Sequence, residues 1–209
     1  MANYCSNSIV FCSKDRAKLS VFLRKMSAAF TTRDSHFYNF MVLHGYGNRE
    51  ISAVIDKRDF FTSCDTRLTV KDGTYNFRLD TETAWEPHMD VFRKVLKEKY
   101  GNVIQMVYVA EECGSSIFIN SDTEGKFLPE RYMVDCCHNG EYHKEYFDSY
   151  QEAVEWVRGE YTDTGFGKYD SIADIEKKVN NSVYRGEDDL FTMHRFEPEY
   201  SYQVERSVA

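Results

Sequence analysis

The part of the sequence that decides the fold is YNFRLDTETAWEPHMDVFRKVLKEKYGNVIQMVYVA, residues 75–110. Polar and apolar residues alternate over positions 75–84, which is typical of a strand with one buried face. Apolar residues then recur at helical spacing, between Pro87 in the expected first turn and Gly101 at the expected C-cap. Val103–Ala110 is apolar on both faces apart from Gln105 and therefore predicts a central strand.

The residues before this stretch complete a recognisable order of elements. Cys5–Cys12 alternates like a first strand, and an apolar stripe from Leu19 to Phe30 predicts a helix that Ser13 caps. Thr66–Val70 precedes the Asp72-Gly73 pair that favours a tight hairpin turn into the strand at positions 75–84. The resulting order of strand, helix, strand, strand, helix, strand predicts an α+β, ferredoxin-like split βαβ core with helices on one face.

Further strand patterns follow that core and lead us to expect a larger sheet. They occupy Ser115–Asn120, Arg131–Cys136 and Tyr142–Phe147, and we expect them to extend the same antiparallel sheet. We therefore predict one α+β domain over residues 1–147, with an insertion at about 31–63. Residues 148–209 are expected to form C-terminal helices and a tail that pack on or flank this domain.

Composition narrows the classes of function. The 209 residues include 26 Lys and Arg against 34 Asp and Glu, a formal net charge of -8, which disfavours binding to nucleic acid. No apolar run of about 18 residues suggests a membrane span, and no signal peptide is visible at the N-terminus. We therefore expect a cytoplasmic protein whose six cysteines are free thiols, without a cofactor or a bound metal.

Three motifs resemble a known family. Residues 1–9, MANYCSNSI, resemble the opening of the YubB-type ferredoxin-like domain proteins, which phages, plasmids and other mobile elements carry. The same resemblance extends to Thr83-Ala84-Trp85-Glu86-Pro87 and to Glu111-Glu112-Cys113-Gly114, so that it covers roughly residues 1–136. It implies the ferredoxin-like fold, and it implies no reaction or catalytic residue. Ferredoxin-like names the topology here, without an Fe–S cluster.

Aromatic and acidic residues suggest a role in binding rather than in catalysis. Fifteen Tyr and fifteen Phe on an acidic chain suit contact with a protein partner, whose identity the sequence does not specify. The candidate binding residues are Tyr75, Phe77, Trp85, Glu111 and Glu112. We expect binding through the open face of the sheet or through the aromatic and acidic segment 184–204.

Two other classes of function stay open at this point. A sheet with exposed aromatics is also how RNA-recognition modules stack bases, which makes a single-stranded nucleic-acid binder the first alternative. The second is a hydrolase that uses two carboxylates about 5–9 Å apart. Its candidate carboxylates are Asp80, Glu82, Glu111, Glu112, Asp122 and Glu124.

Cysteine and histidine patterns do not predict a reactive or metal-binding site. Cys136-Cys137-His138 lies near His143, but neighbouring residues of a strand point to opposite faces, which disfavours a shared metal. Cys113 follows two glutamates, whose charge opposes formation of a thiolate. The sequence therefore assigns no catalytic residue.

Overall fold

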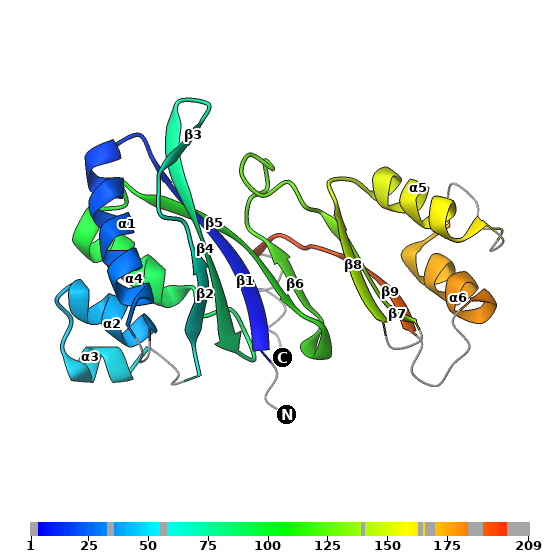
Figure 1. Ribbon diagram of the computed structural model, residues 1–209, viewed down its shortest axis with the longest axis horizontal. Coiled ribbons are helices and arrows are strands. Elements are labelled where there is room, and N and C mark those ends of the chain that lie inside the picture. Colours follow the sequence, from blue (N-terminus) through cyan, green and yellow to red (C-terminus); the bar gives the residue numbers. More distant parts are fainter. Residues whose placement is uncertain are drawn as a thin grey trace. The chain divides into compact units, whose positions relative to one another are not determined.

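A computed structural model describes residues 4–32, 36–54, 58–138, 141–162, 165, 170–183 and 190–199. The chain divides into two compact units, Met1–Ser121 and Asp122–Ala209, which we describe separately. Helices and antiparallel sheets occur in both units, so the fold class is α+β (Figure 1). Within the described ranges, every helix falls short of the length and apolarity that a membrane crossing requires.

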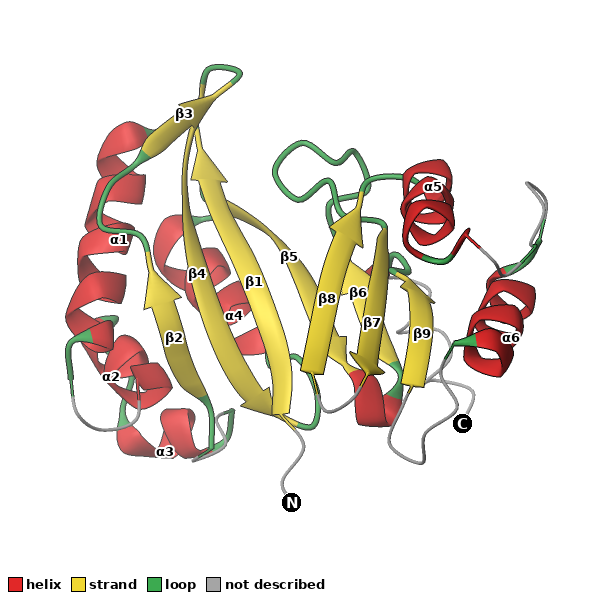
Figure 2. Ribbon diagram, turned by 45° about the vertical axis from the view of Figure 1, so that its right-hand side comes forward, coloured by secondary structure: helices red, strands yellow, loops and turns green. Residues whose placement is uncertain are grey.

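The first unit is built on an antiparallel sheet with the strand order β2-β4-β1-β5-β6, and β3 pairs with β4 (Figure 2). Its elements are β1 (Tyr4–Ser13), α1 (Arg16–Phe30), α2 (His36–Leu43), α3 (Asn48–Ser52), β2 (Phe60–Cys64), β3 (Thr69–Lys71), β4 (Thr74–Ala84), α4 (Asp90–Tyr100), β5 (Gln105–Glu112), η1 (Cys113–Ser115) and β6 (Ile117–Asn120). The long central strand β1 pairs antiparallel with both β4 and β5.

A cluster of phenylalanines forms the core on one face of this sheet. The Phe11 ring lies 4.9 Å from that of Phe22 on α1 and 5.4 Å from that of Phe92 on α4, so both helices cover the same face (Figure 1). The order of elements predicts this placement of both helices on one face, and the ring contacts confirm it. Phe37 and Phe40 of α2 join the same cluster by contacting Phe92, so α2 is part of the core.

The hairpin was predicted correctly, but the strand before it was missed. Asp72 and Gly73 adopt positive φ angles of 48° and 71° between β3 and β4, as a tight hairpin turn requires. The strand that pairs with the other half of β4 is Phe60–Cys64, inside the expected insertion at 31–63. Its five residues are too short to give a periodic signal.

The ends of two helices refine the sequence-based expectations. Gly101 caps α4 with a positive φ of 60°, as predicted. The helix itself begins at Asp90, so Pro87 lies before its first turn, and the intervening residues form a corner described below. The N-cap of α1 is Asp15, whose carboxylate accepts from the Lys18 N–H at 3.0 Å, whereas Ser13 was expected in that role.

The second unit contains a separate antiparallel sheet with the order β8-β7-β9. Its elements are β7 (Tyr132–His138), β8 (Glu141–Phe147), α5 (Tyr150–Glu160), α6 (Ile172–Ser182) and β9 (Leu190–Arg195). Val154 and Val157 from α5 and Ile175 and Val179 from α6 pack with Phe191 of β9 in its core.

This second sheet corrects two expectations. Of the later strands, β6 extends the first sheet, but β7 and β8 pair with β9 instead of continuing it. Strand β9 lies in a tail without a periodic pattern and was not predicted; its pairing partner is β7. The division after Ser121 also differs from the expected boundary between residues 147 and 148.

Candidate functional site at the Trp85 corner

The chain turns sharply between β4 and α4, and Trp85 is at the centre of the turn. Its φ angle is 69°, and the Glu86 N–H donates to the Ala84 carbonyl at 2.8 Å, which closes a three-residue γ-turn. This positive-φ γ-turn is rare, and a bulky side chain is strained there. Strain of this kind, on the order of 1–3 kcal/mol, persists where neighbouring groups hold the backbone in place.

Asp59 is the group that holds this turn at both ends. Its carboxylate is buried, and one oxygen accepts from the Ala84 N–H at 3.1 Å. The other oxygen lies 2.7 Å from Nδ1 of His88, a partly exposed residue on the far side of the turn. A charged acceptor forms stronger hydrogen bonds than a neutral one, so Asp59 is well suited to fix the strained backbone.

A buried polar network supports the turn from the β1 side. The Thr83 hydroxyl donates to the Glu86 carbonyl at 2.7 Å, and the Asn7 side chain donates to the hydroxyls of Thr81 and Thr83 at 3.2 and 3.0 Å. Cys5 lies in the same network, and its thiol donates to Asn7 at 3.5 Å. The corner therefore rests on satisfied hydrogen bonds rather than on apolar packing alone.

Burial makes the Cys5 thiol unreactive. The pKa of Cys5 is raised to about 12, mainly by burial and in addition by the negative charges of Glu112 and Glu111. The nucleophilic form of cysteine is the thiolate, which such a pKa suppresses at neutral pH. Cys5 is therefore a structural residue of the corner.

Aromatic side chains and one guanidinium form the surface of this corner. Trp85 is 47% exposed, and the Arg58 guanidinium lies 6.0 Å from the centre of its ring. Tyr4, also exposed, pairs with Ala84 in the sheet register and contacts the Phe60 ring edge-on at 5.8 Å. We name this surface, formed by Tyr4, Arg58, Phe60 and Trp85, the Trp85 corner. Trp, Tyr and Arg are the residues that most often dominate the energy of protein interfaces.

Two of the other predicted binding residues lie on the helix-covered side of β4. Phe77 is fully buried and stacks on Phe11 at 5.2 Å, so its expected role in binding is corrected to a role in the core. The alternation of polar and apolar residues along β4 shows that one face of the strand is buried. It does not show whether Phe77 lies on the buried face or on the open face. Tyr75 lies on the same side, half-buried, with the Arg16 guanidinium 5.8 Å from its ring centre.

The two predicted glutamates point to opposite faces of β5. Glu112 is buried, and its carboxylate accepts from the backbone N–H groups of Gly114 and Ser115, so it caps the 3₁₀ turn η1. Glu111 pairs in register with Ser6 on the opposite face. The structure therefore does not bring Glu111 and Glu112 together with Trp85 into one site.

The face of the sheet away from the helices is polar along β4 and the first half of β1, where register and alternation place Ser6, Ser8, Arg78, Asp80 and Glu82. Along β5 and β6 the same face carries apolar residues, among them Val109 and Phe118, which are buried. Stacking of bases requires exposed aromatic residues, whereas Phe118 is buried, which weighs against the single-strand alternative. Asp80 accepts from the Arg78 guanidinium and from the Ser8 hydroxyl, both at 2.8 Å, which marks an ion-paired surface carboxylate rather than a catalytic acid.

The cysteine and histidine motif of the second unit is divided by its strand. Cys136 belongs to the core and donates its thiol to the His143 carbonyl at 3.6 Å, while Cys137 lies on the other face of β7. Among the described residues, no group of three or more His, Cys, Asp or Glu is placed to hold a metal ion. The expected binding segment 184–204 lies partly outside the described residues, and its described part includes β9.

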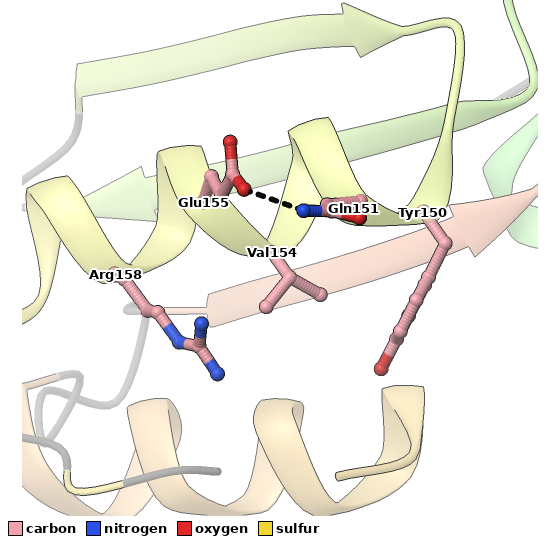
Figure 3. A pocket seen from close by; sticks show the side chains of 5 residues that line it. All are labelled: Tyr150, Gln151, Val154, Glu155 and Arg158. Carbon is pink, nitrogen blue, oxygen red and sulfur yellow. Dashed lines mark hydrogen bonds between the residues drawn. The ribbon is translucent and has the colours of Figure 1, made fainter. Parts of the chain in front are cut away.

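A pocket of about 290 Å³ lies along α5 in the second unit. Tyr150, Val154 and Arg158 point from α5 toward α6, whereas Gln151 and Glu155 bond to each other at 2.8 Å on another side of the helix (Figure 3). The Tyr150 hydroxyl donates to the Asp170 carbonyl at one end. None of the residues predicted to bind or to catalyse lines this pocket.

Sequence reasoning identified Trp85 but missed the residues that position it. Asp59 and Arg58 lie in the segment 31–63, which the sequence pattern predicts to be an insertion, and the same pattern predicts that His88 lies in a helix. A buried carboxylate carries no periodic signal, so only the fold reveals its partners. Searches of family models, of curated proteins and of solved structures gave no match to this chain.

Proposed function

We propose that this chain is a non-enzymatic accessory protein that acts by binding a protein partner through the Trp85 corner. The observation that carries the proposal is the exposed Trp85, held at a strained positive φ by the buried Asp59. A half-exposed indole in such a conformation contributes little to the core. Strained residues of this kind cluster at functional sites, and the inference proceeds from the outlier to the function.

We also propose a ferredoxin-like fold for the first unit and a family for the chain. The strand order β2-β4-β1-β5, with α1 and α4 as the crossing helices, supports a ferredoxin-like split βαβ core for Met1–Ser121. The motifs at residues 1–9, 83–87 and 111–114 support membership of the YubB-type family. Within that family the protein would serve a phage, plasmid or other mobile element.

The motif 83–87 is also consistent with the proposed site. It contains the γ-turn residue Trp85 and the hydroxyl of Thr83 that bonds to the Glu86 carbonyl. Residues 4–9 of the first motif supply Tyr4 to the corner and Asn7 to the network beneath it. Two of the three motifs that carry the resemblance therefore contribute residues to the corner, whereas Arg58, Asp59 and Phe60 lie outside them.

Affinity capture from the native host tests this proposal. We expect the wild-type chain to recover a specific protein that Trp85→Ala fails to recover. Val70→Ala, which removes an exposed apolar side chain from β3, is the matched control and should recover the same protein. Equal recovery by Trp85→Ala would exclude the corner as the contact surface, and the absence of any specific protein would count against a protein partner.

A further inference from the structure

Charge is divided unevenly between the two compact units. Met1–Ser121 contains 16 Lys and Arg against 14 Asp and Glu, whereas Asp122–Ala209 contains 10 against 20. The net charge of -8 therefore comes from the second unit alone. A partner of that unit gains from carrying positive charge, because complementary charge speeds encounter and suppresses wrong partners.

Strand β8 is at one end of the second sheet. In the part of the chain that the structure describes, its sheet neighbour is β7 (Figure 2). An edge strand presents a row of backbone N–H and C=O groups to which a further strand can pair. Natural edges are often protected by proline, by several lysines or by shortness, but β8 has seven residues, no proline and one lysine, Lys144.

The two faces of β8 carry different chemistry. Tyr142 and Tyr146, which are 83% and 43% exposed, flank Lys144 on the face away from the helices. Glu141 and Glu145 lie on the other face, where Glu145 accepts from His143 at 3.2 Å. A strand added at this edge would meet aromatic rings on one face and carboxylates on the other.

Helix α5 packs against one face of β8. The His143 ring stacks on Trp156 of α5 with centres 5.8 Å apart and an interplanar angle of 13°. Phe147 contacts the same indole at 5.7 Å. A preformed edge avoids the ordering cost that a flexible segment incurs on binding, so it favours recognition.

We propose that the outer edge of β8 binds an extended segment of a partner protein in which cationic and apolar residues alternate. The cations lie opposite Glu141 and Glu145, and the apolar residues pack against Tyr142 and Tyr146. The segment adds a strand to the sheet, so that its backbone provides affinity and its alternation provides specificity. This inference goes beyond the proposed function, because β8 belongs to Asp122–Ala209, whereas the Trp85 corner belongs to Met1–Ser121. A second copy of the acidic unit is disfavoured as occupant by like-charge repulsion.

A synthetic peptide tests the inference on the full-length protein. The probe is fluorescein-labelled Lys-Val-Lys-Thr-Lys-Val-Lys-Thr, and the comparison peptide has Glu in place of each Lys. We expect the cationic peptide to bind in fluorescence anisotropy, more weakly as salt rises, and to slow amide hydrogen exchange in residues 141–147. The acidic peptide should do neither, and equal binding of both peptides would overturn the inference.

Substitutions in the protein test the role of charge. The double variant Glu141→Gln/Glu145→Gln should weaken binding of the cationic peptide at least tenfold at low salt. Glu124→Gln/Glu197→Gln removes the same charge outside β8 and α5, and it should bind like the wild type. Equal weakening by both pairs would show that the net charge of the unit, rather than β8, attracts the peptide, which contradicts the inference.

Two N-methylated peptides test strand pairing without altering the protein. In one the backbone nitrogens of the Lys residues are methylated, and in the other those of the Val and Thr residues. Because alternate N–H groups of a strand point to opposite sides, one of the two peptides should lose binding and the other should keep it. Retained binding by both would overturn strand addition.

Two further outcomes distinguish a partner segment at β8 from a second copy of the chain at β8 and from binding at the Trp85 corner. Protection of residues 141–147 that increases with protein concentration, without any peptide, would identify a second copy as occupant and overturn the inference. Recovery of a partner that depends on Trp85, without protection of β8 by the cationic peptide, would refute this inference and leave the proposed function standing.

Discussion

The buried histidine His44 makes the stability of the first unit depend on pH. It is 5% exposed, its Nδ1 lies 2.8 Å from the Phe40 carbonyl, and its Nε2 lies 3.1 Å from the Tyr100 hydroxyl. A carbonyl only accepts, so Nδ1 carries the proton and Nε2 accepts from Tyr100. Burial lowers the pKa of His44 to about 4, and the positive charges of Lys25 and Lys99 act in the same direction.

The difference in proton binding between the folded and unfolded chain determines in which direction, and by how much, pH changes the free energy of unfolding. Because the folded pKa of His44 is about 4 and its ordinary value is 6.5, the unfolded chain binds more protons between these values. The stabilisation is present above pH 6.5 and is lost as the pH falls toward 4. The proton uptake of this one group lowers the free energy of unfolding by about 2 kcal/mol between pH 7 and pH 5. His44→Gln removes the titrating group and should remove this loss.

The chain has two tryptophans, one in each compact unit, so tryptophan fluorescence can be made to report on one unit. Trp85 lies in Met1–Ser121 and Trp156 in Asp122–Ala209, so Trp156→Phe leaves an indole that reports on the first unit alone. Urea unfolding followed by Trp85 fluorescence at pH 7, 6 and 5 gives the free energy at each pH. His143→Gln in the second unit controls for the loss of a histidine as such.

One outcome would contradict the assignment of the pH dependence to His44. If the variant His44→Gln loses the same free energy of unfolding between pH 7 and pH 5 as its parent, another group causes the dependence. A lower but pH-independent stability of the variant would support the assignment, because the ring contacts of His44 with Phe40 and Tyr100 are lost at every pH.

Three further predictions concern the Trp85 corner and the residues beneath it. Trp85→Gly should be more stable than Trp85→Ala by about 1 kcal/mol in urea unfolding, because glycine adopts positive φ without strain; the usual order, alanine above glycine, would contradict the strained turn. Asp59→Ala should lower the free energy of unfolding by about 2–3 kcal/mol, because it leaves the N–H of Ala84 unpaired, and a loss within experimental error would exclude the clamp. In native protein at pH 8, iodoacetamide should alkylate the exposed Cys113 and spare Cys5, whose pKa burial raises to about 12; mass spectrometry that finds Cys5 modified first would refute its burial.

The elements with periodic patterns were predictable from the sequence. Alternation over residues 75–84 identified β4, and the pairs Asp72-Gly73 and Tyr100-Gly101 identified a hairpin and a helix end, because these signals are local. Strand pairing is not local. The patterns of β7 and β8 indicate strands, but nothing in them states which sheet they join.

The candidate site was predictable only in its exposed centre. Trp85 stood out because it precedes Pro87 at the end of a clear strand. Asp59, which holds the turn, is separated from Ala84 by 25 positions, and its short neighbouring strand β2 has no periodic signal. The sequence therefore suggested a contact residue without the residues that determine its conformation.

The position of Asp59 determines at which stage of folding the turn around Trp85 gains its supporting hydrogen bonds. Asp59 directly precedes Phe60, the first residue of β2, and it reaches Ala84 only when β2 has docked beside β4. Contacts between distant parts of a chain form late, because their loops must close first. A truncated or half-folded chain therefore lacks the carboxylate that bonds to the Ala84 N–H, so the exposed position of Trp85 at the γ-turn depends on a docked β2.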